Sequence, residues 1–226
     1  MVIGSHDLIL DYLADKMPLS SGHVGSMGGV LAIKRNEAHI APVHLIDEKL
    51  GTYNMHLLDQ YFKGEAVTII RGVKREQGIL VEKGNPKGIH SLADLSKEDI
   101  SFVNRQRGSG TRQLLDFELK KLGIASDSIY GYTREVNTHM AVAVSVKSDG
   151  ADAGLGIRAA AEAFDLDFIP IGFESYDFLV RDRYLEDTRV KAFIEVLKSD
   201  WFKETLETIG GYALDHPGTQ NKVVSL

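Results

Sequence analysis

The sequence predicts an α/β fold, because short apolar runs typical of strands alternate along the chain with runs of helical periodicity. Hydrophobic residues make up 43% of the 226 residues and charged residues 26%, which is the composition of an ordinary globular protein. At about 150 residues per domain, the length corresponds to roughly 1.5 domains. This value predicts either one large domain or two small lobes built from one continuous chain.

Composition and charge exclude several classes of function. The 26 basic and 32 acidic residues give a net charge of −6, so no basic excess indicates nucleic acid binding in this chain. The absence of cysteine excludes disulfides, thiolate metal sites and cysteine nucleophiles. The eight histidines show no paired spacing, so we expect no metal site. Without a signal peptide or a long apolar segment, we expect a cytoplasmic protein with no membrane span, periplasmic only if a signal was removed.

The first third of the chain predicts a strand, two helices and further strands. Val2-Ile3 is a short strand, and Ser5 is the expected cap of a helix over Asp7–Met17. A second helix is expected over Val30–Glu37, after a glycine-rich turn. Three more strands are predicted here, the first with Pro42 at its end or at a sheet edge: His39–Leu45, Val67–Arg71 and Gly78–Val81.

The remaining elements continue the alternation of helices and strands. Helices are predicted over Ser91–Leu95, Thr111–Leu122, Met140–Val146 and Val190–Trp201; strands are predicted over Ile100–Val103, Ala151–Ile157, Asp167–Phe173 and Tyr176–Val180. The apolar stripe that ends at Trp201 is interpreted as core. The tail, Asp215–Leu226, is polar and expected to be partly extended.

The strongest functional feature is the segment Asn104–Arg112, which follows a predicted strand and opens a predicted helix. The first amides of a helix have no internal partner and carry positive dipole character, so such a segment can hold an anion. An ordinary glycine-rich turn with a serine cap is the alternative. We expect ligand contacts from five residues here: Arg107, Ser109, Gly110, Thr111 and Arg112.

Two further loop-to-helix segments have the same character. One is Gly25–Gly29, where Ser26 and Met27 are candidate ligand contacts, and its alternative is a flexible turn. The other is Ser5-His6-Asp7, whose alternative is a simple helix cap. In open α/β sheets, ligands collect at the carboxyl ends of strands, where such helices begin.

Histidines near these segments complete the candidate set. His44 ends a predicted strand, and Thr138-His139 stands at a predicted helix start, so His6, His44 and His139 could converge on one ligand. Ser109 lacks the nucleophile-elbow context of a catalytic serine. We therefore expect no catalytic residues and a protein that is not an enzyme.

Several blocks in order resemble one known family, the PBP-like domain of the type II periplasmic-binding-protein fold. The resemblance covers the chain from Gly4 to about Tyr212 and is carried by Lys74–Val81, Gly84–Ile89, Leu92–Leu95, Asn104–Arg112, Tyr132–His139 and Ala151–Ile157. It implies an α/β fold with two lobes, two crossover segments and a ligand cleft between the lobes. Lobe I would hold residues 1–76 plus 178–226, and lobe II residues 77–177.

The resemblance also implies a function. Domains of this family occur alone, fused to the molybdopterin biosynthesis protein MoeA, or fused to helix-turn-helix regulators, and their relatives include molybdate- and tungstate-binding receptors. We therefore expect a module that binds or senses a small oxyanion, molybdate or tungstate first, or a molybdopterin-related ligand, with no other cofactor. Two alternatives stay open: an accessory domain of a MoeA-like enzyme, and the ligand-sensing half of a transcription regulator.

Overall fold

The computed structural model describes residues 1–222 and divides the chain into two compact units. Unit 1 holds Met1–Arg75 and the chain from Glu174 onward, and unit 2 holds Glu76–Phe173. The sequence-based boundaries at 76 and 178 lie one and four residues from these. Strands β6 (Val67–Val81) and β10 (Asp167–Arg181) each run through both units. No helix within the described residues is both long and apolar enough to cross a membrane.

Unit 1 is built on a mixed sheet with the strand order β2-β1-β3-β10-β6. Strands β1 (Val2–Gly4), β2 (Ser21–His23) and β3 (Ile40–Val43) are parallel, and β10 runs antiparallel to β3. Strands β11 (Tyr212–Leu214) and β12 (Gln220–Lys222) pair with β6 in antiparallel fashion. A separate short hairpin is formed by β4 (Ile46–Asp47) and β5 (Thr52–Tyr53).

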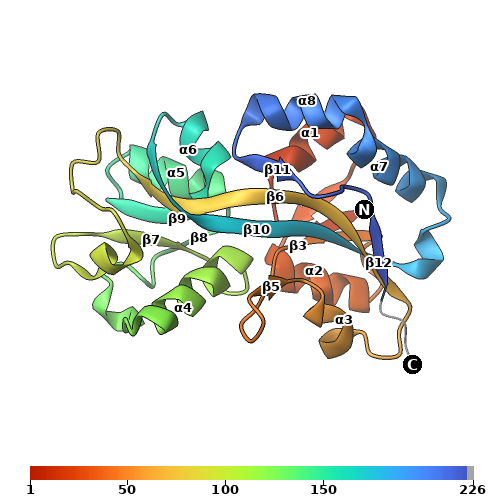
Figure 1. Ribbon diagram of the computed structural model, residues 1–226, viewed down its shortest axis with the longest axis horizontal. Helices are drawn as coiled ribbons and strands as arrows, with labels where there is room; N and C mark the ends of the chain where they lie inside the picture. Colours follow the sequence, from red (N-terminus) through yellow and green to blue (C-terminus); the bar gives the residue numbers. More distant parts are fainter. Residues whose placement is uncertain (223–226) are drawn as a thin grey trace. The chain divides into compact units, whose positions relative to one another are not determined.

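Helices cover both faces of this sheet (Figure 1). One face carries α1 (Leu8–Lys16), α7 (Thr188–Lys198) and α8 (Asp200–Ile209), and the other carries α2 (Gly25–Lys34) and α3 (His56–Tyr61). A short 3₁₀ turn, η3 (Asp182–Tyr184), leads from β10 towards α7. Phe178 and Val180 of β10 pack in the core with residues of α1, α7 and α8, and Leu179 packs in the core with residues of α2 and α3. This alternation is expected because neighbouring strand residues face opposite sides of the sheet.

Unit 2 has the strand order β6-β9-β7-β8. Strand β9 (Ala153–Ile157) is antiparallel to β6, whereas β7 (Phe102–Arg105) is parallel to β9 and to β8 (Glu135–Val136). Its helices are α4 (Gly110–Leu122), α5 (His139–Lys147) and α6 (Arg158–Ala163), with 3₁₀ turns η1 (Leu92–Ser96) and η2 (Ser126–Ser128). Leu115 and Leu119 of α4 pack with Leu155 of β9 in its core.

The sequence-based prediction was wrong about the two long strands, each of which it divided into two. In β6 the charged residues around Arg75 interrupt the apolar pattern, yet the strand continues because the Arg75 side chain is buried on carboxylates of the same unit. In β10 the polar segment around Glu174 likewise interrupts the apolar pattern, and the strand continues through it. In both strands, contacts with residues distant in the sequence stabilise a polar segment that the apolar pattern alone does not predict to be a strand.

Helix boundaries also differ from the prediction in three places. Helix α1 is capped by Asp7, whose carboxylate accepts from the Ile9 amide, and not by Ser5. Helix α2 begins at Gly25, five residues before the predicted start at Val30. The predicted helix that ends at Trp201 is two helices, because Ser199 ends α7 and its hydroxyl caps α8 by accepting from the Phe202 amide at 3.2 Å.

Two strand predictions need correction as well. Pro42 does lie near the end of β3, but this strand is interior, between β1 and β10, and not at a sheet edge. The Pro42 carbonyl accepts from the Ser5 amide at 2.9 Å. Proline has no backbone N–H, so this carbonyl is the one backbone hydrogen-bonding group that it offers to the sheet. Strand β7 starts at Phe102, two residues after the predicted start at Ile100. Residues 223–226 of the predicted tail lie outside the described residues.

We predict that Gly72→Ala lowers the stability of the protein and that Gly172→Ala leaves it nearly unchanged. A Cβ at Gly72 would lie 2.1 Å from the Tyr176 carbonyl oxygen, which is backbone and has little freedom to move, whereas a Cβ at Gly172 meets nothing within 4 Å. Overpacking of this kind costs about 1–3 kcal/mol. Urea unfolding of the two variants measures the difference, and equal midpoints would contradict the packing described for β6.

Candidate functional site

The carboxyl ends of the parallel strands in unit 1 gather polar residues at one edge of the sheet. Strand β1 ends at Gly4 and is followed by Ser5, β2 ends at His23 and leads into α2, and β3 ends at Val43 and is followed by His44. Parallel neighbours end on the same side, so these segments lie together. Ser5, Asp7, Ser26 and His44 are all fully buried.

Arg75 lies at the centre of this buried polar cluster. Its guanidinium donates from Nη1 to Asp7 Oδ2 at 2.5 Å and from Nε to Glu174, and both carboxylates are as fully buried as the arginine. The guanidinium also lies 4.3 Å from the centre of the Tyr176 ring. Burial alone would lower the pKa of Arg75, but the carboxylates of Glu174 and Asp7 raise it above its ordinary value, so the side chain stays charged.

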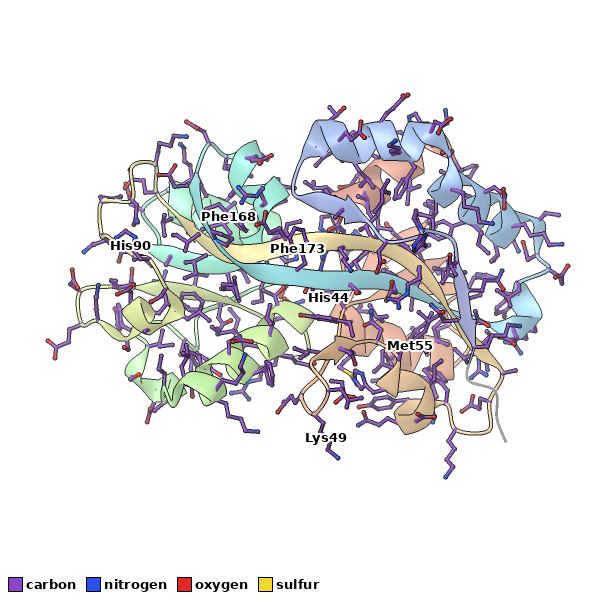
Figure 2. The ribbon with its side chains drawn as sticks, in the orientation of Figure 1. His44, Lys49, Met55, His90, Phe168 and Phe173 are labelled. Carbon is purple, nitrogen blue, oxygen red and sulfur yellow. The ribbon has the colours of Figure 1, made fainter. Side chains whose placement is uncertain are left out.

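His44 extends the cluster from Glu174 to the first helix. Its Nδ1 lies 2.8 Å from Glu174 Oε2, and its Nε2 lies 2.8 Å from Ser5 Oγ. With Glu174 ionised, the Nδ1–H donates to the carboxylate, which fixes the orientation of the ring. The backbone amide of His44 donates to Ser26 Oγ at 3.2 Å, so the start of α2 is tied to the same group. Figure 2 labels His44 on the unit 1 side of the chain.

Two tyrosines complete the cluster as hydrogen-bond donors. Tyr212 donates to Asp7 Oδ1 at 2.8 Å, and Tyr176 donates to the Ser5 carbonyl at 2.7 Å. Burial, reinforced by the nearby Asp7 carboxylate, raises the pKa of both phenols well above 10. They therefore remain protonated at neutral pH and hold the turn from β1 into α1 in place.

One donor of this cluster has no protein acceptor. Within the described residues, the buried Nη2 of Arg75 makes no hydrogen bond. Unpaired buried donors are rare in native proteins and mark a place where a water or a ligand group binds. The guanidinium touches Asp7, the N-cap of α1, so the unpaired donor belongs to the same edge as the starts of α1 and α2. Helix α2 has no side-chain cap at all, which leaves its first amides available.

Unit 2 has a similar edge by itself. Strands β7 and β8 are parallel, and their carboxyl ends lead to the starts of α4 and α5. Ser109 caps α4 by accepting from the Arg112 amide at 3.2 Å, and Thr138 caps α5 by accepting from the Ala141 amide at 3.0 Å. Each helix begins one residue before its predicted start, Thr111 or Met140, and the cap at Ser109 is the alternative that the sequence left open for this turn. The first amides of each helix have no intrahelical acceptor.

Buried side chains surround these two helix starts. Thr111 is fully buried, and its hydroxyl accepts from Gln77 Nε2 at 3.3 Å. Arg105, at the end of β7, is buried and donates from Nη2 to the Asn137 carbonyl at 3.0 Å, just before α5. His139, the first residue of α5, is also buried. Gly110 is the first residue of α4, at the helix start where the sequence predicts a contact between the backbone and a ligand.

The two arginines expected to face an anion have other surroundings. Arg112 donates from Nη1 to Glu135 and from Nε to Asp116, each at 3.2 Å, and stacks on Tyr132 at 4.0 Å. Its charge is therefore already neutralised by two carboxylates. The Arg107 side chain is 84% exposed and lies 3.8 Å from Glu135. These contacts argue against the expectation that Arg107 and Arg112 supply the positive charge of the site.

The other predicted residues of unit 1 are also accounted for. His6 does not join the buried cluster through a hydrogen bond; its Nε2 lies 3.4 Å from Asp11, and its ring packs edge-on against His23 at 4.6 Å. Met27 packs against the core beneath α2. The negative charge of Asp7, which by itself would repel an anion, is compensated by Arg75. No group of three or more His, Asp or Glu side chains among residues 1–222 is arranged to hold a metal ion.

A protein-family model described as the PBP superfamily domain matches residues 10–198. The chain belongs to this family. YvgK of Bacillus subtilis, a protein described as uncharacterized, is 35% identical to the PBP domain over 219 residues, which is 94% of this chain and 70% of YvgK. The family assignment confirms the fold-level part of the resemblance seen in the sequence.

Solved structures support the same fold for the PBP domain. A putative phosphate ABC transporter substrate-binding protein with bound phosphate from Clostridium perfringens aligns with a TM-score of 0.68 at 12% identity, over 95% of this chain and 98% of that one. An ABC-type phosphate transport receptor from Vibrio cholerae aligns with a TM-score of 0.62 at 18% identity, over 95% and 99%. The chain thus has the two-lobed α/β fold of periplasmic binding proteins.

Four residues of the buried cluster in this PBP domain were not expected from the sequence: Arg75, Glu174, Tyr176 and Tyr212. For Arg75 and Glu174, the one signal in the sequence is a charged residue inside a predicted strand region. Arg75 and Glu174 each interrupt a β-type apolar pattern, and a charged residue at an inward position of a strand needs a buried partner of opposite sign. Nothing local to Tyr176 or Tyr212 distinguishes them from core aromatics.

We predict that Asp7→Asn destabilises the protein strongly and that Asp11→Asn, on the same helix, does not. The first change leaves the buried Arg75 with one fewer carboxylate and turns an amide group towards donors, whereas the Asp11 side chain is 61% exposed and lies 3.4 Å from His6 Nε2. Breaking a buried ion pair costs about 3–5 kcal/mol. Thermal and urea unfolding at neutral pH measure both, and equal losses would contradict the central role of Asp7.

Proposed function

We propose that this PBP domain binds a small tetrahedral oxyanion and is not an enzyme. The observation that carries the proposal is the charged, buried guanidinium of Arg75, whose Nη2 has no acceptor within the described residues and which touches the N-cap of α1. An oxyanion oxygen supplies the acceptor that this donor lacks. Hydrogen bonds between charged partners are the stronger ones, so Arg75 is the anchoring residue of the proposal.

Helix starts supply the remaining donors. In unit 1, the first amides of α2 are uncapped, and the Ser5 and Ser26 hydroxyls lie in the same buried group. Amides at helix starts bind phosphate-like groups because they combine free N–H donors with the positive end of the helix dipole.

Phosphate is the first ligand to test, since the two solved structures with this fold described above are named for phosphate transport. Molybdate and tungstate, the ligands that the sequence resemblance implied, have the same tetrahedral shape and enter the proposal as competitors. The cluster Asp7, Glu174 and Arg75 carries one more negative than positive charge when His44 is neutral.

We predict that calorimetric titration with phosphate, molybdate, tungstate and sulfate detects saturable binding of at least one of them. Arg75→Lys keeps the charge but removes the forked donor, so binding should weaken at least about 100-fold, and Ser5→Ala should weaken it about 10-fold through the loss of one hydrogen bond. Circular dichroism and the unfolding midpoint show whether each variant is folded.

Arg112→Lys is the matched control, because its guanidinium is held by Glu135 and Asp116 and not by the proposed ligand. Its affinity should stay within about twofold of the parent. If none of the four anions binds the parent protein, the proposed function is wrong. If Arg112→Lys abolishes binding while folded Arg75→Lys retains it, the anchor is in unit 2 and the assignment to Arg75 is wrong.

A further inference from the structure

Unit 1 has a cavity at the amino ends of its parallel strands, away from the cluster around Arg75. It is a cavity of about 460 Å³ whose lining includes the starts of β1 and β3 at Val2 and Ile40 and the residue before β2, Ser20. The polar cluster around Arg75 follows the opposite, carboxyl ends of the same strands. Because the strands are parallel, the cavity and the cluster stand at opposite edges of one sheet, and one ligand cannot occupy both.

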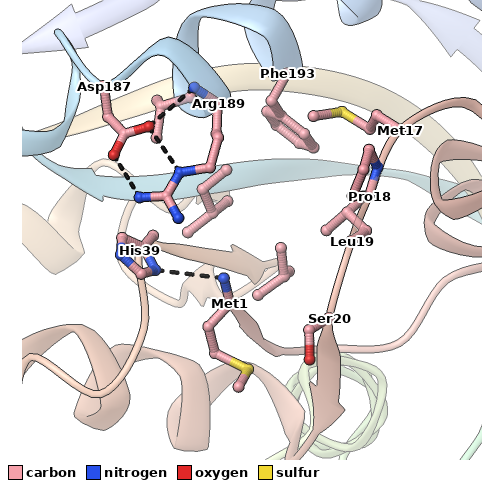
Figure 3. A pocket seen from close by; sticks show the side chains of 12 residues that line it. Met1, Met17, Pro18, Leu19, Ser20, His39, Asp187, Arg189 and Phe193 are labelled. Carbon is pink, nitrogen blue, oxygen red and sulfur yellow. Dashed lines mark hydrogen bonds and ion pairs between the residues drawn. The ribbon is translucent and has the colours of Figure 1, made fainter.

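Apolar side chains form most of the cavity wall. Figure 3 shows Met17, Pro18 and Leu19, from the connection between α1 and β2, along one side, with Phe193 of α7 close to Met17. Val190 of α7 also lines the cavity, and Phe193 and Val190 belong to the core of the same unit. A volume of roughly 300–1,000 Å³ with apolar walls and a few polar groups is characteristic of small-molecule sites.

Three polar side chains, Arg189, Asp187 and His39, are gathered on one side of the cavity. Arg189 donates to Asp187 from Nη2 at 2.6 Å and from Nε at 3.0 Å, and its side chain is still 74% exposed. His39 lines the cavity beside them, with the Met1 nitrogen 3.3 Å from its Nδ1 (Figure 3). Arg183 donates to Asn36 and acts electrostatically on His39 as well.

These charges identify the sign of the ligand group. The side chains that act electrostatically on His39 are those of Arg189 and Arg183, both positive, and the single carboxylate of Asp187. Burial, followed by these cations, lowers the pKa of His39, so its ring is neutral at pH 7 and can donate or accept a hydrogen bond. An acidic group is therefore favoured beside Arg189 and His39, and a cationic one is disfavoured.

We propose that this cavity binds a small molecule that has an apolar body and a carboxylate group. The apolar body lies against Phe193, Val190 and Leu19, and the carboxylate pairs with Arg189 at the edge of the cavity. The guanidinium has N–H groups beyond the two that reach Asp187, so it can hold a second carboxylate without losing the first. This site is independent of the proposed oxyanion site and does not need it.

The test uses three probes of equal chain length that differ only in the head group: heptanoate, heptan-1-ol and heptylammonium. Titrations of ¹⁵N-labelled full-length protein at pH 7.5 follow the amide shifts. We expect saturable shifts with heptanoate at the cavity residues, an affinity at least about 10-fold higher than for heptan-1-ol, and no saturation with heptylammonium. Equal affinities for heptanoate and heptan-1-ol, or shifts spread evenly over the protein, would overturn the proposal.

Variants then locate the binding. Ser20→Phe places a ring in the cavity from an exposed loop position, so heptanoate affinity should fall at least about 10-fold; Ser21→Phe, an exposed neighbour that does not line the cavity, should change it less than twofold. Arg189→Gln should remove the preference for heptanoate over heptan-1-ol while leaving the alcohol unaffected. Retention of full heptanoate affinity in folded Ser20→Phe, or an equal loss in Ser21→Phe, would show that the ligand binds elsewhere.

Discussion

A single buried arginine determines much of the organisation of unit 1. Removing a guanidinium from water is costly unless its charge is compensated, and Arg75 is compensated by Asp7 and Glu174, which come from the start of α1 and from β10. Asp7 and Glu174 are 68 and 99 positions from Arg75 in the sequence, respectively. Compensating this one charge therefore joins the amino-terminal helix to both long strands. His44 and Tyr212 are held through the same two carboxylates.

Packing around this charge leaves little freedom for the backbone. Phe178 and Val180 of β10 contribute to one core of unit 1 and Leu179 to the other, so the register of the strand cannot slip by one residue without exposing apolar side chains and burying polar ones. Gly72 of β6 allows the close approach of the Tyr176 backbone. The same strand segment therefore carries a close backbone contact and, three residues later, the buried Arg75.

The parallel strands give unit 1 two edges of different character. At the carboxyl ends, helix starts, serines and a charged donor without a protein acceptor suit a compact anion. At the amino ends, the connections between elements leave an apolar cavity with a positive side. This asymmetry follows from the βαβ connection, which places helix starts at one edge of a parallel sheet and helix ends at the other. The two proposed ligands, an oxyanion and a carboxylate with an apolar body, would therefore bind at different edges.

The sequence by itself determined the α/β class, the family, and the helix starts at Ser109 and Thr138, because periodicity and capping are local signals. Tertiary structure alone decided that β6 and β10 each continue through a charged segment, that Ser199 separates α7 from α8, and that Arg112 binds Glu135 and Asp116. It also decided which arginines are buried: Arg75, Arg105 and Arg112. A guanidinium looks the same in sequence whether it faces water or two carboxylates, and only the fold brings Asp7 and Glu174 to Arg75.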